Sequence, residues 1–186
     1  VDEIAPLYAD AWKRLDVKYD DFIRTTEERH KVGVRKLLQA CYDAGDIELD
    51  VYRGHYCVAC EAYYVQDELV EGNCPIHKTA VNYVEEENYF FRLSRFEQRL
   101  IDWYEQHPDA IVPEFRRNEV LGFIKGGLND FSVSRKSLKW GIPLPWDDSH
   151  VAYVWFDALS NYITAHGYGS DDARFAKNWP VDWHFI

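Results

Sequence analysis

Long apolar runs are missing from this chain, and so is methionine. No apolar run approaches the roughly 20 residues that span a bilayer, and the N-terminus lacks the charged, apolar and small-residue sections of a secretory signal peptide. We therefore expect a soluble, cytoplasmic protein that does not enter a membrane. Because no initiator methionine is present and the chain stops inside an apparent strand at 183–186, we expect a piece of a longer protein.

Basic residues are also in short supply, with 21 lysines and arginines against 32 acidic residues and a formal net charge of −11. This balance argues against a broad phosphate-binding surface and leaves room only for a local basic patch. No G-x-S-x-G elbow, Walker-type loop, internal repeat or low-complexity segment occurs. Apolar residues make up 47% of the chain and aromatics 16%, which is enough for a packed core.

Cysteine is scarce, but three of the four cysteines occur in a pattern. Cys57 and Cys60 form C-V-A-C, and after thirteen residues Cys74 and His77 form C-P-I-H. Two intervening residues let each pair turn back onto one ion, about 2.0–2.3 Å from each ligand atom. The set is complete without a fifth ligand, so we predict one structural zinc that stabilises a segment with too few apolar side chains to fold alone.

Two alternatives for the cysteines are weaker. A disulfide with a surface histidine would suit a secreted chain, whereas reduced thiols suit the expected cytoplasmic setting. A redox C-x-x-C would need a βαβ context, and the sequence around Cys57 shows none. The nearby acids Glu61, Asp67 and Glu71 are expected to be solvated, and Cys41 is expected to lie in the core on the apolar face of a helix.

Hydrophobic periodicity and start and stop signals predict mixed α/β structure. Two of the predicted helices open with capping-box patterns, Thr25-x-x-Glu28 and Ser94-x-x-Glu97. The predicted helices cover residues 1–16, 25–44, 94–107, 113–125 and 158–166. The first is expected to bury Leu7, Ala11, Trp12 and Leu15, and the fourth is expected to run through Phe115, Val120 and Phe123. Strands are predicted over residues 19–24, 47–51, 62–65, 131–135, 151–156 and 183–186, and residues 89–91 form a further apolar run.

The stretch Tyr153 to Tyr162 is the second unusual feature. A strand buried on both faces is expected to end in a helix capped by Asp157, and open α/β sheets bind ligands at that end of a strand. Trp155 and Tyr162 could line an apolar pocket there, although core packing is the favoured interpretation from the residues alone. Arg135 is interpreted, on the same basis, as a surface cation. The remaining histidines show no spacing for a second metal or a relay; they are His30, His55, His107, His150, His166 and His184.

The motifs, taken in order, resemble one family. They read D-D-F-I-R-T-T-E-E-R-H, Y-x-G-x-Y-C-V-A-C-E, C-P-I-H, E-E-N-Y-F-F-R-L, S-V-S-R-x-S-L-K-W-G-I-P-L-P and Y-V-W-F-D-A-L-S-N-Y. This order resembles the methionyl-tRNA synthetases, which are class I aminoacyl-tRNA synthetases. The resemblance covers almost the whole chain, which a generic zinc ribbon would not reproduce.

The resemblance implies an α/β fold, in which a partial Rossmann-type catalytic domain is interrupted by an α+β connective-peptide insertion with a zinc knuckle. Catalytic-domain pieces would comprise residues 1–28 and 149–186. The connective peptide would comprise residues 29–148, with the knuckle at 54–80 and one zinc ion.

The resemblance also implies site residues and a reaction. Trp155, Ala158 and Tyr162 match positions that line the methionine pocket, and Arg135 matches an arginine that helps to complete the site. Leu159 stands where other branches have proline. The full-length enzyme would use ATP and Mg to form methionyl-adenylate and then transfer methionine to tRNA(Met), by holding ATP and carboxylate in line.

The departures from the family pattern restrict this expectation. His-Ile-Gly-His would precede residue 1, and Lys-Met-Ser-Lys-Ser and a Gly-Lys-Asp segment would follow residue 186. We therefore assign no catalytic residue and expect the chain alone to be inactive. The alternative is a stand-alone zinc-ribbon interaction or nucleic-acid-binding module, which the acidic charge and the Tyr153 to Tyr162 stretch disfavour. A cysteinyl-type synthetase is disfavoured because its metal binds the substrate.

Overall fold

The computed structural model describes residues 2–60 and 62–185, apart from the side chains of Tyr52 and Tyr63. Its packing divides the chain into two compact units. One comprises Val1–Val34 and Ala158–Ile186, and the other Arg35–Asp157. These are units of packing, so the boundaries between catalytic domain and insertion stay a prediction. The described elements combine helices and sheets, which confirms the mixed α/β class.

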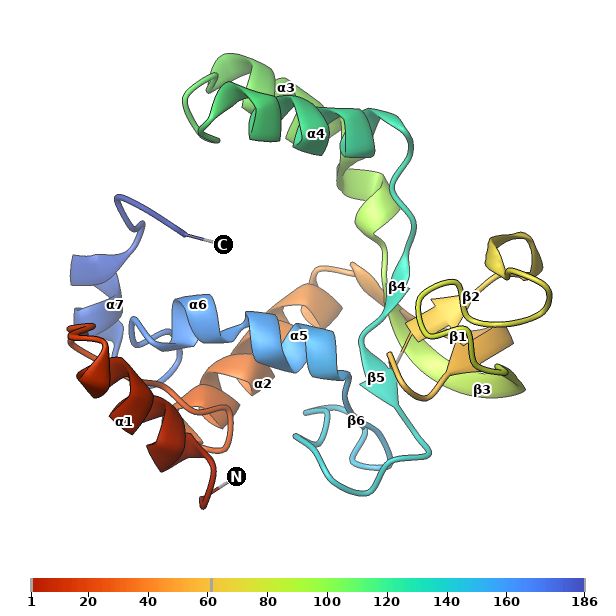
Figure 1. Cartoon of the computed structure of the whole chain (residues 1–186), viewed down its shortest axis with the longest axis horizontal. Coiled ribbons are helices and arrows are strands. Elements are labelled where there is room, and N and C mark those ends of the chain that lie inside the picture. Colours follow the sequence, from red (N-terminus) through yellow and green to blue (C-terminus); the bar gives the residue numbers. More distant parts are fainter. Residues whose placement is uncertain (1, 61, 186) are drawn as a thin grey trace. The chain divides into compact units, whose positions relative to one another are not determined.

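The larger unit is built on a four-stranded antiparallel sheet in the order β2-β1-β3-β4 (Figure 1). Its strands are β1 (Ile47–Cys57), β2 (Ala62–Tyr64), β3 (Asn82–Phe91) and β4 (Phe131–Ser132). The β1 to β3 ladder runs from Ile47 opposite Phe91 to Tyr56 opposite Asn82. The strands predicted at 47–51 and 62–65 are confirmed, and β1 continues without a break to the first cysteine. The apolar run at 89–91 forms the end of β3.

A second, two-stranded sheet pairs β5 (Ser134–Arg135) with β6 (Val151–Ala152). The strand predicted at 131–135 is therefore interrupted at Val133. This residue hydrogen-bonds to β3 of the first sheet through its N–H and to the residue directly after β6 of the second sheet through its carbonyl. Its N–H donates to Tyr89 O at 2.8 Å, and its carbonyl accepts from Tyr153 N at 2.8 Å. The loop between the strands folds back onto β6 through the buried residues Ile142 and Leu144.

The strand predicted at 151–156 is wrong beyond Ala152, because helix α5 (Val154–Leu159) begins there. The Asp157 N–H donates to Tyr153 O at 3.0 Å, so Asp157 lies inside a helical turn. The prediction that Asp157 caps the helix is therefore wrong. Apolar side chains alone did not distinguish a buried strand from a short helix here.

Two helices, α3 (Glu97–Gln106) and α4 (Glu114–Lys125), lie side by side in the larger unit (Figure 1). A short 3₁₀ turn, η2 (Leu93–Phe96), precedes α3, and another, η1 (Gln66–Glu68), follows β2. Because η2 includes Ser94, the capping box predicted there is wrong: the Ser94 N–H and hydroxyl donate to Asp130 at 3.0 and 2.7 Å. Glu97 instead accepts from Leu128 N at 2.9 Å.

Helix α4 buries Leu121 and Ile124. The helix predicted through Phe115, Val120 and Phe123 is confirmed, and both phenylalanines are exposed. In a helix of this length two stripes carry apolar residues, and the packing partner decides which one is covered.

The smaller unit contains α1 (Ala5–Arg14), α6 (Asn161–Thr164), α7 (Asp172–Asn178) and the first part of α2 (Glu28–Asp43). The helix predicted to open at Thr25 is confirmed as α2, but it begins three residues later, at Glu28. Its predicted stop before Gly45, which has φ +77°, is confirmed. Within α2, Val34 and Leu38 are fully buried, while Cys41 is only half-buried. Helix α1 confirms the first predicted helix, but Leu7 and Leu15 are 66% and 74% exposed, so the predicted burial is wrong.

Two predicted strands of the smaller unit are not formed. Residues 19–24 and 183–185 have no strand partner among the described residues, and Ile186 lies outside them. A strand requires a hydrogen-bonded neighbour. Asp21 instead forms ion pairs with Arg29 at 2.6 Å and Arg174 at 2.7 Å. Within the described part of the chain, no helix is both long and apolar enough to cross a bilayer.

Candidate metal centre and predicted substrate-binding residues

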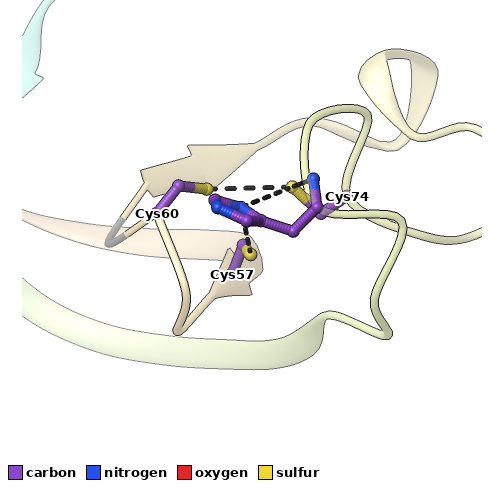
Figure 2. A group of neighbouring side chains, drawn as sticks. Cys57, Cys60 and Cys74 are labelled. Atoms are coloured by element: carbon purple, nitrogen blue, oxygen red, sulfur yellow. Dashed lines mark hydrogen bonds between the residues drawn. The ribbon is translucent and has the colours of Figure 1, made fainter.

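Two turns bring the predicted metal ligands together. Cys57 is the last residue of β1, and Cys60 lies in the connection to β2. Cys74 follows a tight turn in which Val70 and Asn73 exchange backbone hydrogen bonds of 3.0 and 2.9 Å. Figure 2 shows the sulfur atoms of the three labelled cysteines directed toward one another.

The separations between donor atoms suit a tetrahedral ion. All four ligand atoms lie within 4.8 Å of one another. The Cys60 Sγ to Cys74 Sγ distance is 3.7 Å, and His77 Nδ1 lies 3.9 Å from Cys57 Sγ and 3.8 Å from Cys74 Sγ. Tetrahedral bonds of zinc length would separate sulfur and nitrogen ligands by about 3.5–3.8 Å. The residues therefore fit a zinc ion: these three distances are within a few tenths of an ångström of the tetrahedral values, and the remaining pairs would close by at most about 1 Å.

The four cysteines are free thiols, which contradicts the disulfide alternative. The Cys60 to Cys74 sulfur distance of 3.7 Å far exceeds the about 2.05 Å of an S–S bond. Asp67 and Glu71 are exposed as expected, and Glu61 lies outside the described residues.

Backbone hydrogen bonds favour the thiolate form that a metal requires. Burial by itself raises the pKa of Cys74, but the N–H groups of His77 and Ile76 and the His77 ring outweigh it and lower that pKa to about 6. The His77 N–H lies 3.4 Å from Cys74 Sγ. For Cys57, burial is likewise outweighed by the N–H groups of Cys60 and Ala59, so its pKa is lowered. Such turns stabilise anionic sulfur before any ion arrives.

Tyr64 belongs to this centre, although its individual role was not predicted. Its hydroxyl lies 3.3 Å from Cys60 Sγ and 3.7 Å from Cys74 Sγ. Hydrogen bonding to Cys60, with burial and contact to Cys74, raises the pKa of Tyr64. It therefore stays a neutral donor to sulfur, as outer-shell partners of metal ligands do. Its position four residues after Cys60, on β2, was the available signal.

Arg135 is buried in the larger unit, which contradicts the surface-cation interpretation. The residue is only 4% exposed. Its guanidinium carbon lies 4.3 Å from the Tyr56 ring centroid and 5.0 Å from that of Tyr153. Its Nη1 lies 3.5 Å from Glu86 Oε2. No sequence pattern identified these partners, which come from three strands or their ends.

The predicted pocket residues fall into both units. Trp155, on α5 in the larger unit, is 52% exposed and is therefore not a core residue there. Ala158 and Tyr162 belong to the smaller unit, where the Tyr162 ring lies 4.1 Å from the ring of His184. Leu159 is exposed. Arg135 and Trp155 therefore belong to the larger unit, and Ala158 and Tyr162 belong to the smaller unit.

Comparisons with known proteins agree along the chain. The family model described as tRNA synthetases class I (M) matches residues 1–85 and 76–185. The methionine–tRNA ligase of Clostridium acetobutylicum is 50% identical over 188 residues, which cover 100% of this chain and 29% of that relative. The Thermotoga maritima enzyme is 48% identical over 189 residues, covering 100% of this chain and 30% of the relative.

Solved structures show the same relationship. Mycobacterium tuberculosis methionyl-tRNA synthetase in complex with methionyl-adenylate is 42% identical, with a TM-score of 0.87 over 95% of this chain and 36% of that one. Its apo form has a TM-score of 0.85. The chain spans about 29% of the length of the curated relatives it matches. Since the family model matches nearly all residues in order, the chain belongs to the class I tRNA synthetases of the (M) family.

Proposed function

We propose that the protein containing this chain activates methionine with ATP, as methionyl-adenylate, and transfers it to tRNA(Met). The observation that carries this proposal is the identity of about half of the residues, along the whole chain, with methionine–tRNA ligases. The partners would be methionine, ATP with Mg, and the tRNA. The family structure with bound methionyl-adenylate supports the same reaction.

Within that protein, we propose that Cys57, Cys60, Cys74 and His77 hold one structural zinc. The ion would supply four bonds that replace the missing core of the knuckle. The residues themselves provide three sulfurs and one imidazole nitrogen at suitable separations. Tyr64 would donate its hydroxyl hydrogen to Cys60 Sγ, 3.3 Å away, and so hold that sulfur in place.

We propose that Trp155, Ala158 and Tyr162 contribute to the pocket for the methionine side chain. Aromatic faces are suited to a thioether, because sulfur packs favourably against aromatic rings. Arg135 would add a buried positive charge near the bound amino acid or its adenylate. None of these groups transfers a proton or forms a bond in this proposal; they orient the substrate.

We further propose that residues 29–148 are an insertion between two catalytic-domain pieces, 1–28 and 149–186. The packing boundaries, after Val34 and after Asp157, lie six and nine residues beyond the proposed domain boundaries. Helices α2 and α5 cross the packing boundaries. Continuous helices of this kind would connect the insertion to its host domain.

The test of the pocket is Trp155→Ala in the full-length protein, read out as methionine-dependent ATP–pyrophosphate exchange. We expect a higher KM for methionine, because a large apolar contact is removed. Trp140→Ala is a matched control, since Trp140 is 76% exposed in the same unit. An unchanged methionine dependence for Trp155→Ala would refute the assignment.

The chain alone is proposed to lack this activity. Neither His-Ile-Gly-His nor Lys-Met-Ser-Lys-Ser occurs among its 186 residues. We expect no methionine-dependent exchange from the purified 186-residue chain, under conditions in which the full-length protein is active. Measurable exchange by the chain alone would overturn this proposal.

A further inference from the structure

Strand β3 carries three consecutive acids that face in different directions. Glu85 pairs with Arg53 at 3.1 Å, and Glu87 pairs with Lys136 at 3.1 Å; these four side chains are all about half exposed or more. Successive side chains of a strand alternate between faces. The side chain of Glu86 is accordingly covered, with 15% exposure.

The Glu86 carboxylate contacts Arg135 and the backbone just after it. Oε2 lies 3.5 Å from Arg135 Nη1 and accepts from Asn88 Nδ2 at 3.2 Å. Oε1 accepts from the Ser137 N–H at 2.8 Å. One side chain on β3 thus holds both the guanidinium and the main chain two residues beyond it.

Two aromatic rings also lie against the guanidinium. Tyr56 and Tyr153 attract a cation through their faces, but they carry no charge and place few constraints on where it sits. An open pocket of about 370 Å³ borders Glu86 and Arg135, with Val58, Val84 and Leu138 on its apolar side. The pocket gives the guanidinium room to shift when the charge of Glu86 is removed.

Glu86 presents a negative charge to the Arg135 guanidinium. Burial raises its pKa, but hydrogen bonds from Asn88 and Ser137 and the charge of Arg135 outweigh burial, and the pKa lies below its ordinary value. The carboxylate is ionised at neutral pH. A buried ion pair with extra hydrogen bonds contributes directional precision as much as stability.

We propose that Glu86 is a positioning residue that sets the location of the Arg135 guanidinium for amino-acid activation. This inference rests on the proposed function, in which Arg135 contributes to the methionine site. Glu86 itself does not touch substrate. Its effect passes through Arg135, and the two should behave as one unit.

The test uses Glu86→Gln in the full-length protein, with Glu87→Gln as the control. Both changes remove one negative charge from the same strand, but Glu87 pairs with Lys136 on the exposed side. Glutamine keeps an acceptor for Ser137 and presents an uncharged amide to Arg135. We expect kcat/KM for methionine in pyrophosphate exchange to fall about tenfold or more for Glu86→Gln and to change less than about twofold for Glu87→Gln.

A double-mutant cycle with Arg135→Gln separates positioning from general stability. Adding Glu86→Gln to Arg135→Gln should cause little further loss, because the group that Glu86 positions is already gone. If the double variant instead loses activity by the product of the two single-variant factors, the inference is wrong. Assays are run well below the unfolding temperature of every variant, so that a folding defect does not register as lost activity.

The role of Arg135 in the methionine site and its positioning by Glu86 can be refuted separately. If Arg135→Gln lowers activity while Glu86→Gln does not, positioning by Glu86 is wrong and the role of Arg135 stands. If Arg135→Gln retains full activity, the proposed role of Arg135 is wrong and the inference falls with it.

Discussion

The side chains of His30 and Thr164, 134 residues apart, meet in the interior of the smaller unit. His30 Nδ1 lies 2.8 Å from Thr164 Oγ1, and both residues are fully buried. The contact joins α2 to α6 at the place where Gly33 brings the two helices together. A Cβ at Gly33 would lie 2.4 Å from Thr164 Cγ2 and 2.6 Å from the backbone oxygen of Tyr168.

Gly33→Ala should therefore destabilise the protein. The added methyl group meets backbone as well as side chain, and overpacking of this kind costs about 1–3 kcal/mol. Gly122→Ala is the matched control, because it is also helical and has nothing within 4 Å of the new Cβ. That change should be neutral or stabilising by up to about 1 kcal/mol. Equal melting temperatures for the two variants would contradict the close approach.

Cys74→Ser should release the metal and lower the melting temperature. We expect about one zinc per chain in the unaltered protein and a free-energy loss of at least about 2 kcal/mol without it, because the knuckle has little core of its own. Cys41→Ser is the control, since Cys41 is a half-buried thiol outside the cluster. Metal analysis and thermal unfolding provide the measurement. Zinc-free protein with an unchanged melting temperature would refute the structural role.

Tyr64→Phe should weaken zinc binding without preventing folding. The hydroxyl that lies 3.3 Å from Cys60 Sγ is removed while the ring remains. Loss of an outer-shell partner typically reduces metal affinity about 10-fold to 100-fold. Competition with a chromogenic chelator measures this change. Tyr83→Phe serves as the comparison because Tyr83 is 64% exposed, and equal affinities for both variants would count against the role of Tyr64.

His150 should make stability depend on pH. Burial lowers its pKa below the ordinary 6.5, and Asp147 only partly opposes this. The folded protein therefore keeps His150 neutral where the unfolded chain binds a proton. Stability is fully present above about pH 6.5 and declines as pH falls toward the folded pKa, by up to about 1.4 kcal/mol per pH unit. The groups around the ring are Ser134, Tyr89, Asp147, Lys136, Glu86 and Glu87.

His150→Gln provides the measurement for this prediction. The variant should be less stable at pH 7.5, because Ser134 Oγ loses a ring nitrogen at 3.1 Å. The stability difference between the two proteins, from denaturant unfolding, should shrink between pH 6.5 and 5, since other titrating groups are common to both. A difference that stays constant over this range would show that His150 is not held neutral.

Sequence patterns were most reliable where the controlling interaction is local. Helix α2 was predicted from its i, i+3, i+4 spacing and from Gly45, which ends it in a left-handed conformation. Ser94 and Glu97 have the spacing of a capping box, yet each bonds a partner more than 30 residues away. Local spacing could not reveal that Asp130 and Leu128 would take up the groups that a capping box uses.

The four ligand residues of the knuckle and the family could be predicted from the sequence alone. One C-x-x-C pair, one C-x-x-H pair and an ordered series of motifs are properties of local spacing. Only the tertiary structure decided which of three adjacent acids on β3 faces inward and that Arg135 is buried between Tyr56 and Tyr153. It also decided that residues 154–159 form a helix rather than a strand. These outcomes depend on partners distant in sequence, and each segment's own composition is compatible with either result.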